Sequence, residues 1–138
     1  MNQEQESGGE DSTANLSQDA TMTELLMFFL KEQKKIILRK KQDITVAIYE
    51  YMFAHRGEQD ALEVVRSQFD TGTMILAKII QEGAERGEFY CTNAKAEANN
   101  IMYALEGMKI CAKTLGLSER KVDEELLYLV SGLVMEEE

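Results

Sequence analysis

Apolar residues recur along most of this sequence three or four positions apart, which is the spacing of an α-helix and not of a strand. Thr21 and Glu24 have the spacing of a capping box directly before an apolar run, so they predict where the first helix begins. A second helix is expected to begin near Asp43, as its N-cap, and to end at Gly57. Together with the later segments, the pattern predicts an all-α fold, a bundle of about five helices.

A long third helix is predicted over 59–86, and its end lies in the run IIQEGAERGEF at 79–89. Gly87 fits the left-handed position after a helix C-terminus, which only glycine occupies without a Cβ penalty. Phe89 can then fold back onto the last turn as the apolar partner of this cap. Gly83 lies inside the helix, where glycine is unfavourable, so we expect it to allow close approach of a neighbouring backbone. This helix-end motif sets where the next helix departs.

The last two helices carry more apolar surface than one domain can cover. The fourth is expected from Asn93, its N-cap, to about Thr114, and the fifth begins after Ser118 and continues through Val134. One face of the fourth helix is apolar at Ala98, Ile101, Leu105, Met108, Ala112 and Leu115. A nearly opposite face is formed by Tyr103, Gly107 and Ile110. Because a helix on the outside of a monomer needs only one apolar face, we expect a second copy of the chain to cover the other.

The predicted homodimer has a four-helix interface built from the last two helices of each copy. Its residues are expected to be Tyr103, Gly107, Ile110, Leu127, Ser131 and Val134. The last three lie together on one edge of the apolar arc of the fifth helix.

Composition and charge add the domain organisation. The chain has 138 residues, no proline and a formal net charge of −10. Residues 1–20 are polar and acidic, and we expect a flexible tail or linker there, followed by one helical domain over 21–138. The basic stretch from Lys31 to Lys41 lacks the aromatic side chains of a nucleic-acid platform, so we interpret it as a solvated helix face. The sequence has neither a recognisable signal peptide nor an apolar run that could span a membrane, and we expect a cytoplasmic protein.

No catalytic, metal or cofactor site is expected. His55 is interpreted as a helix-end cation or a surface residue, and Cys111 as a core residue. Cys91 lies in a predicted loop and is the more reactive thiol of the two. One histidine and two separated cysteines cannot supply the four ligands of a zinc site, and no carboxylates pair in an apolar setting, so an enzyme is not expected.

Methionine and aromatic side chains are the candidates for the walls of a ligand pocket, because soft side chains suit a cavity that accepts varied apolar ligands. The pocket is predicted from Met52, Phe53, Phe69, Met74, Met102 and Tyr103. Further side chains of the same kind are Met22, Met27, Met108, Phe29 and Tyr49. The alternative is that all of them simply fill the core.

The run IIQEGAERGEF, followed by a helix with ALEGM and a last helix with LVSGL, resembles the C-terminal domain of TetR-type bacterial transcriptional regulators. The resemblance covers about residues 21–137 and is strongest over 79–89. It implies a dimer through the last two helices and a small apolar effector bound beside the long third helix. Family members begin with a helix-turn-helix domain, and no such segment is found in this sequence. The resemblance therefore implies that the chain contacts DNA only through a missing N-terminal domain.

A stand-alone helical homodimeric adaptor without a ligand is the alternative function. The two hypotheses differ in one observable property, because only a ligand-sensing domain shows a ligand-dependent rise in melting temperature.

Overall fold

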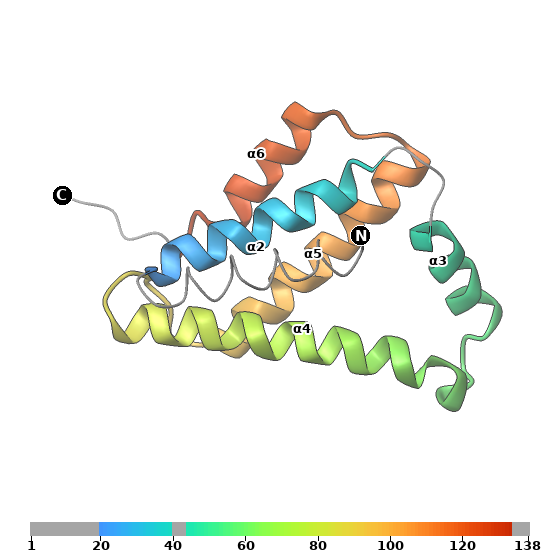
Figure 1. Cartoon of the computed structure of the whole chain (residues 1–138), viewed down its shortest axis with the longest axis horizontal. Coiled ribbons are helices and arrows are strands. Elements are labelled where there is room, and N and C mark those ends of the chain that lie inside the picture. The colour runs from blue at the N-terminus through green and yellow to red at the C-terminus, as the bar shows by residue number, and fades with distance from the viewer. Residues whose placement is uncertain (1–19, 40–43, 134–138) are drawn as a thin grey trace, which may run out of the picture.

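The regular secondary structure of the chain is helical throughout the part that the computed structural model describes, residues 20–39 and 44–133. In chain order the helices are α2 (Met22–Ile37), α3 (Ile44–Ala54), α4 (Gln59–Glu85), α5 (Ala94–Thr114) and α6 (Glu119–Val130) (Figure 1). The predicted all-α fold is confirmed. The predicted tail and the Asp43 cap lie outside the described residues, apart from Ala20, whose side chain is buried.

Four of these helices share one hydrophobic core. α2, α4 and α5 pack against one another, and α6 packs against α2 and α5, whereas α3 lies apart from the bundle (Figure 1). Each of the four contributes residues spaced three or four positions apart, which is why one side of each faces the core. The most deeply buried side chains are Leu26, Ile37, Leu76, Ile80, Ala98, Ile101, Leu105, Val122 and Leu133.

The helices begin where the capping residues predict. At the start of α2, the Thr21 hydroxyl accepts from the N–H of Glu24 (3.0 Å), and the Glu24 carboxylate accepts from the N–H of Thr21 (3.1 Å). This is the complete capping box that the spacing predicts. The side chains of Asn93 and Ser118 each accept a backbone N–H of the following first turn, in α5 and α6 respectively.

α5 ends at Thr114 as predicted, but two other predictions near helix ends are wrong. Leu115 does not join the core face of α5, because the helix ends at Thr114 and Leu115 is 85% exposed. Gly116 follows with φ +92° and turns the chain away from the helix axis. The last helix is shorter than predicted, since α6 ends at Val130 and turns follow as far as Leu133, which still buries its side chain.

The end of α4 is a Schellman motif. The N–H of Glu88 donates to the carbonyl of Gly83 (2.7 Å), and the N–H of Gly87 donates to the carbonyl of Ala84 (3.2 Å). Gly87 has φ +83°, the left-handed conformation that its position predicts. Because glycine has no Cβ, the reversal of the chain there carries no steric strain.

The expectation for Gly83 needs a correction. The group that approaches it closely is the ring of Phe89 and not a neighbouring backbone, since a Cβ on Gly83 would lie 2.2 Å from Phe89 Cδ2. Phe89 is 4% exposed and belongs to the hydrophobic core. Gly83 therefore leaves the space into which the chain folds back after the reversal.

The two residues on either side of Phe89 connect the reversal to other helices. The carboxylate of Glu88 accepts from the N–H (2.8 Å) and the hydroxyl (3.0 Å) of Thr23, in the first turn of α2. Burial alone would raise the pKa of Glu88, but hydrogen bonds from Thr23 and Met22 outweigh it and lower this pKa. On the other side, the N–H of Tyr90 donates to the carbonyl of Leu133 (2.8 Å), just after α6.

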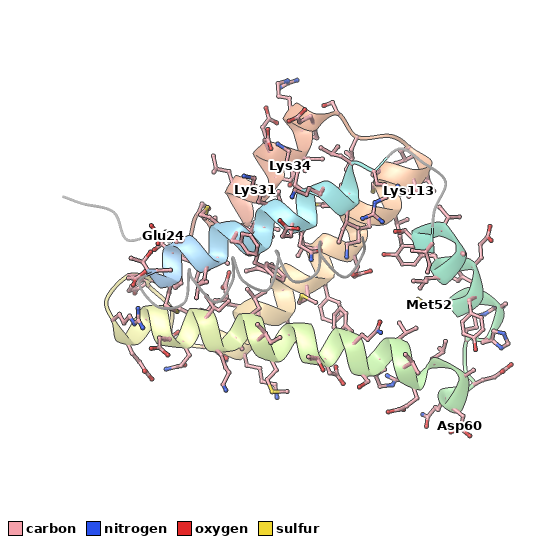
Figure 2. The ribbon with its side chains drawn as sticks, in the orientation of Figure 1. Glu24, Lys31, Lys34, Met52, Asp60 and Lys113 are labelled. Carbon is pink, nitrogen blue, oxygen red and sulfur yellow. The ribbon has the colours of Figure 1, made fainter. Side chains whose placement is uncertain are left out.

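The interpretation of the basic stretch as a solvated face is wrong for Lys34. Its ammonium group lies 2.8 Å from Asp123 and 3.0 Å from Glu119, both on α6. Figure 2 shows Lys34 between α2 and α6. Hydrogen bonds to Asp123 and then to Glu119 raise the pKa of Lys34. This side chain is 26% exposed and ties α6 to α2, so its role is structural.

We expect Gly83→Ala to lower the free energy of unfolding by on the order of 1–2 kcal/mol, although alanine favours helices, because the new methyl group displaces the Phe89 ring. Urea denaturation at a fixed protein concentration measures this change. The matched test is the same substitution in a Phe89→Leu background, where the smaller side chain reduces the cost. A Gly83→Ala protein as stable as the wild type would refute the close contact.

We expect Glu88→Gln to lower the melting temperature at pH 7, because the amide is a weaker acceptor for Thr23 than the carboxylate. The folded-state pKa of Glu88 lies below its ordinary value of 4.5, so its contribution is present above that pH and disappears as the pH falls through the folded-state pKa. The difference between wild type and variant should therefore shrink on acidification. Glu85→Gln, at an exposed position of the same helix end, serves as the control and should have little effect at either pH. A difference that is independent of pH would show that Glu88 does not act through its charge.

Candidate functional site

α3 stands beside the bundle without contributing to its core. None of its residues is buried, although its sequence is mostly apolar. Ile44 is 65% exposed and Phe53 is 63% exposed. Such a helix gains little from packing, and its apolar residues mark a surface that another group could cover. Figure 2 shows Met52 on the side of α3 nearer to α4 and α5, and this side chain is half-buried.

A polar contact connects α3 to α5. The hydroxyl of Tyr49 donates to the carboxylate of Glu106, which also forms an ion pair with Lys109 (3.1 Å). Burial and then the hydrogen bond to Glu106 raise the pKa of Tyr49, so the phenol keeps its proton over the physiological range. Lys109 is only 15% exposed, and its ammonium holds the carboxylate in place.

Aromatic and methionine side chains meet where α4 faces α5, close to Glu106. The rings of Phe69 and Tyr103 lie with their centroids 5.4 Å apart, in a tilted arrangement. The terminal methyl group of Met102 lies over Gly72 of α4, 3.0 Å from where a Cβ would be. Gly72 therefore makes room for a methionine side chain between the two helices.

The six residues predicted for a pocket are not all on one surface. Phe69, Met102 and Tyr103 come together between α4 and α5, and Met52 lies on the neighbouring side of α3. Phe53 is largely exposed. Met74 is 59% exposed and lies about 160° around α4 from the buried Leu76. The alternative that such side chains fill the core applies to Met22, which is buried in it, and to Phe29, Met102 and Met108, which are partly buried and pack against it.

The residues predicted for a dimer interface lie on the outer surface. Tyr103 is 67% exposed and Leu127 is 70% exposed, and Gly107, Ile110 and Ser131 are also exposed. A Cβ added to Gly107 would meet no atom within 4 Å. Val134 lies outside the described residues. Tyr103 serves two surfaces, since its ring also contacts Phe69 within the chain.

Sequence reasoning missed several of the residues that complete these surfaces. Tyr128, 77% exposed on α6 beside Leu127, extends the outer apolar surface. Glu106 gave no local signal, because its partner Tyr49 is 57 residues away. Glu88 stands between the glycine and the phenylalanine of the helix-end motif, and its capping role depends on where α2 lies.

The histidine and the cysteines are not gathered into a reactive site. His55 pairs with Glu58 (3.0 Å) at the end of α3 and stacks on Tyr51, with ring centroids 4.2 Å apart. Both cysteines are free and half-buried. Cys91 lines an open hollow of about 330 Å³ with Tyr90, Asn93, Glu97 and Gly132. Within residues 20–39 and 44–133, no three His, Cys, Asp or Glu side chains are placed to hold a metal ion, and no helix is long and apolar enough to cross a membrane.

Comparison with known proteins identifies the family of this helical bundle. The family described as "Tetracyclin repressor-like, C-terminal domain" matches residues 25–123, which run from α2 into α6. The chain belongs to this family. No curated protein and no solved structure matches the chain.

The family assignment confirms the resemblance of the helix-end motif and the last two helices to a TetR-type C-terminal domain. Such domains generally dimerise, bind small-molecule effectors and have no enzymatic activity. The surface between α3, α4 and α5 is concentrated in aromatic and methionine side chains, whereas the outer surface of α5 and α6 combines exposed apolar and small residues.

Proposed function

We propose that this chain is the effector-binding and dimerisation domain of a bacterial TetR-type transcriptional regulator. Binding of a small apolar effector would control DNA binding by the helix-turn-helix domain of the regulator. The observation that carries the proposal is the family match over residues 25–123. A regulator of this kind acts in the cytoplasm, where the DNA is.

The outer surface of α5 and α6 supports the homodimer. Tyr103, Leu127 and Tyr128 each expose about two-thirds or more of their side chains, which costs free energy in a monomer in water. Gly107 lies on the same surface of α5 with open space above it, and a glycine allows the backbone of a second helix to approach. We assign the four-helix interface to these residues together with Ile110, Ser131 and Val134.

The surface between α3, α4 and α5 supports the effector site. It brings Phe69, Met102 and Tyr103 together, with Met52 nearby on a helix that has no buried residue. Flexible methionines and aromatic rings adapt to apolar ligands of different shapes. Glu106, which accepts from Tyr49 and pairs with Lys109, lies on the same helix as Met102 and Tyr103, so a polar group borders an otherwise apolar site.

An effector that binds the folded domain raises its melting temperature, by the equivalent of about 2.7 kcal/mol at a hundred times its dissociation constant. We expect such a rise for at least one compound of a panel of small aromatic and aliphatic molecules. Phe69→Ala should abolish the rise, because the Phe69–Tyr103 pair forms part of the site. Met74→Ala, on the far side of α4, should retain it. A rise that survives Phe69→Ala would place the site elsewhere, and a panel without effect would favour an adaptor without ligand.

The wild-type chain should be a dimer at tens of micromolar in equilibrium sedimentation, with an interface larger than about 1,000 Å². Leu127→Asp and Gly107→Arg should each shift it towards monomer, because a charge buried at an apolar helix interface has no partner. Met74→Asp adds the same charge to an exposed position on α4 and should leave the dimer intact. Wild-type protein that sediments as a monomer, or a Leu127→Asp protein that dimerises normally, would contradict the assigned interface.

A further inference from the structure

The hydrogen bond between Tyr49 and Glu106 joins α3 to the middle of α5. We propose that this pair is a latch: it holds α3 beside the aromatic surface of α4 and α5, and its opening admits the effector. The gating role rests on the proposed effector function, whereas the latch itself is a property of the fold. Figure 1 shows the setting, with α3 standing away from the bundle on the side where the start of α4 and the end of α5 lie apart.

Packing alone holds α3 weakly. Among the described helices it is the one without a buried residue, and Ile44 and Phe53 turn most of their surfaces to solvent. Gly57 follows it with φ +88°, so the chain between α3 and α4 turns at a residue without a side chain. An element with so few buried apolar contacts lies at the low end of local stability, and single polar contacts then decide its position.

The Tyr49–Glu106 contact is strong enough to fix the position of α3. A hydroxyl that donates to a carboxylate is a charge-assisted hydrogen bond, stronger than a bond between two neutral groups. Tyr49 is partly buried there, so the bond is less exposed to competition from water. Lys109, 15% exposed, pairs with the second oxygen of Glu106 and keeps the carboxylate oriented towards α3.

The latch adjoins the surface that an effector would use. Met102 and Tyr103 precede Glu106 on α5 by one helical turn, and Phe69 stacks on Tyr103 from α4. Tyr103 is already 67% exposed, so movement of α3 away from Glu106 would widen access on the side of α5 that carries Met102 and Glu106. Gly107, on the outer surface, directly follows Glu106, so the latch residue lies beside the surface assigned to the dimer.

Amide hydrogen exchange of the full chain, without any ligand, tests the latch. Tyr49→Phe should accelerate exchange of the α3 amides by about tenfold, the factor that corresponds to one net hydrogen bond, and leave α2 and α6 unchanged. Tyr51→Phe is the matched control on the same helix, because its hydroxyl makes only a long 3.4 Å contact with the carbonyl of Ala61. Its effect on α3 should be smaller than twofold, well below that of Tyr49→Phe.

A double-mutant cycle that combines Tyr49→Phe with Glu106→Ala distinguishes loss of this one hydrogen bond from a general destabilisation of the domain. If the two side chains act through one bond, the double variant exchanges no faster in α3 than either single variant. Unchanged α3 exchange in Tyr49→Phe, or acceleration that extends equally to α2 and α6, would overturn the proposal. So would additive effects in the cycle.

Stopped-flow binding of 8-anilinonaphthalene-1-sulfonate tests the gating role. Tyr49→Phe should raise the association rate of this probe by about the factor seen in exchange, and Tyr51→Phe should not. If the probe binds but its association rate is the same for Tyr49→Phe and wild type, the gating role is refuted, whereas the latch itself is not. Failure of the probe to bind either protein would count against the effector site, while hydrogen exchange still decides the latch.

Discussion

The reversal of the chain between α4 and α5 is the constraint on which the bundle depends. Within eight consecutive residues, Gly83 to Tyr90, the chain ends α4 in a Schellman motif, inserts Phe89 into the core and bonds to both α2 and the segment after α6. Because these contacts come from neighbouring residues, a shift in one of them disturbs the others. The direction of α5, and with it the position of both candidate surfaces, is set at this point.

Local rules were sufficient for the helices and for most of their ends. A capping box at Thr21, N-caps at Asn93 and Ser118 and the left-handed Gly87 depend on residues within a few positions, so the sequence predicts them directly. Contacts between distant residues could not be predicted in this way. Lys34 reaches acidic residues of α6, and Glu106 meets Tyr49, only because the tertiary fold brings these helices together. The candidate sites were partly predictable for the same reason: the spacing identifies a face of a helix, whereas the neighbouring helices decide which face stays open.

α5 connects the two surfaces that the proposed function requires. One side of it is buried in the core, another carries Met102, Tyr103 and Glu106 towards α4 and α3, and the outer side presents Gly107. A rigid helix that borders both an effector site and a dimer interface is suited to pass a displacement from one to the other. Tyr103 contacts Phe69 and is still largely exposed, so under the proposed function it would be the residue where the two roles meet.

The central claim is that two copies meet across the outer surfaces of α5 and α6, with Asp60 at the start of α4 farther from the contact than Glu124 of α6. Distances between nitroxide labels in a variant with Cys91 and Cys111 replaced by serine test this claim directly. Labels at Glu124, exposed on α6, should give a short, narrow distance distribution between copies, and labels at Asp60, at the start of α4, a clearly longer one (Figures 1 and 2). Labels at Asp60 that are closer together than those at Glu124 would contradict it.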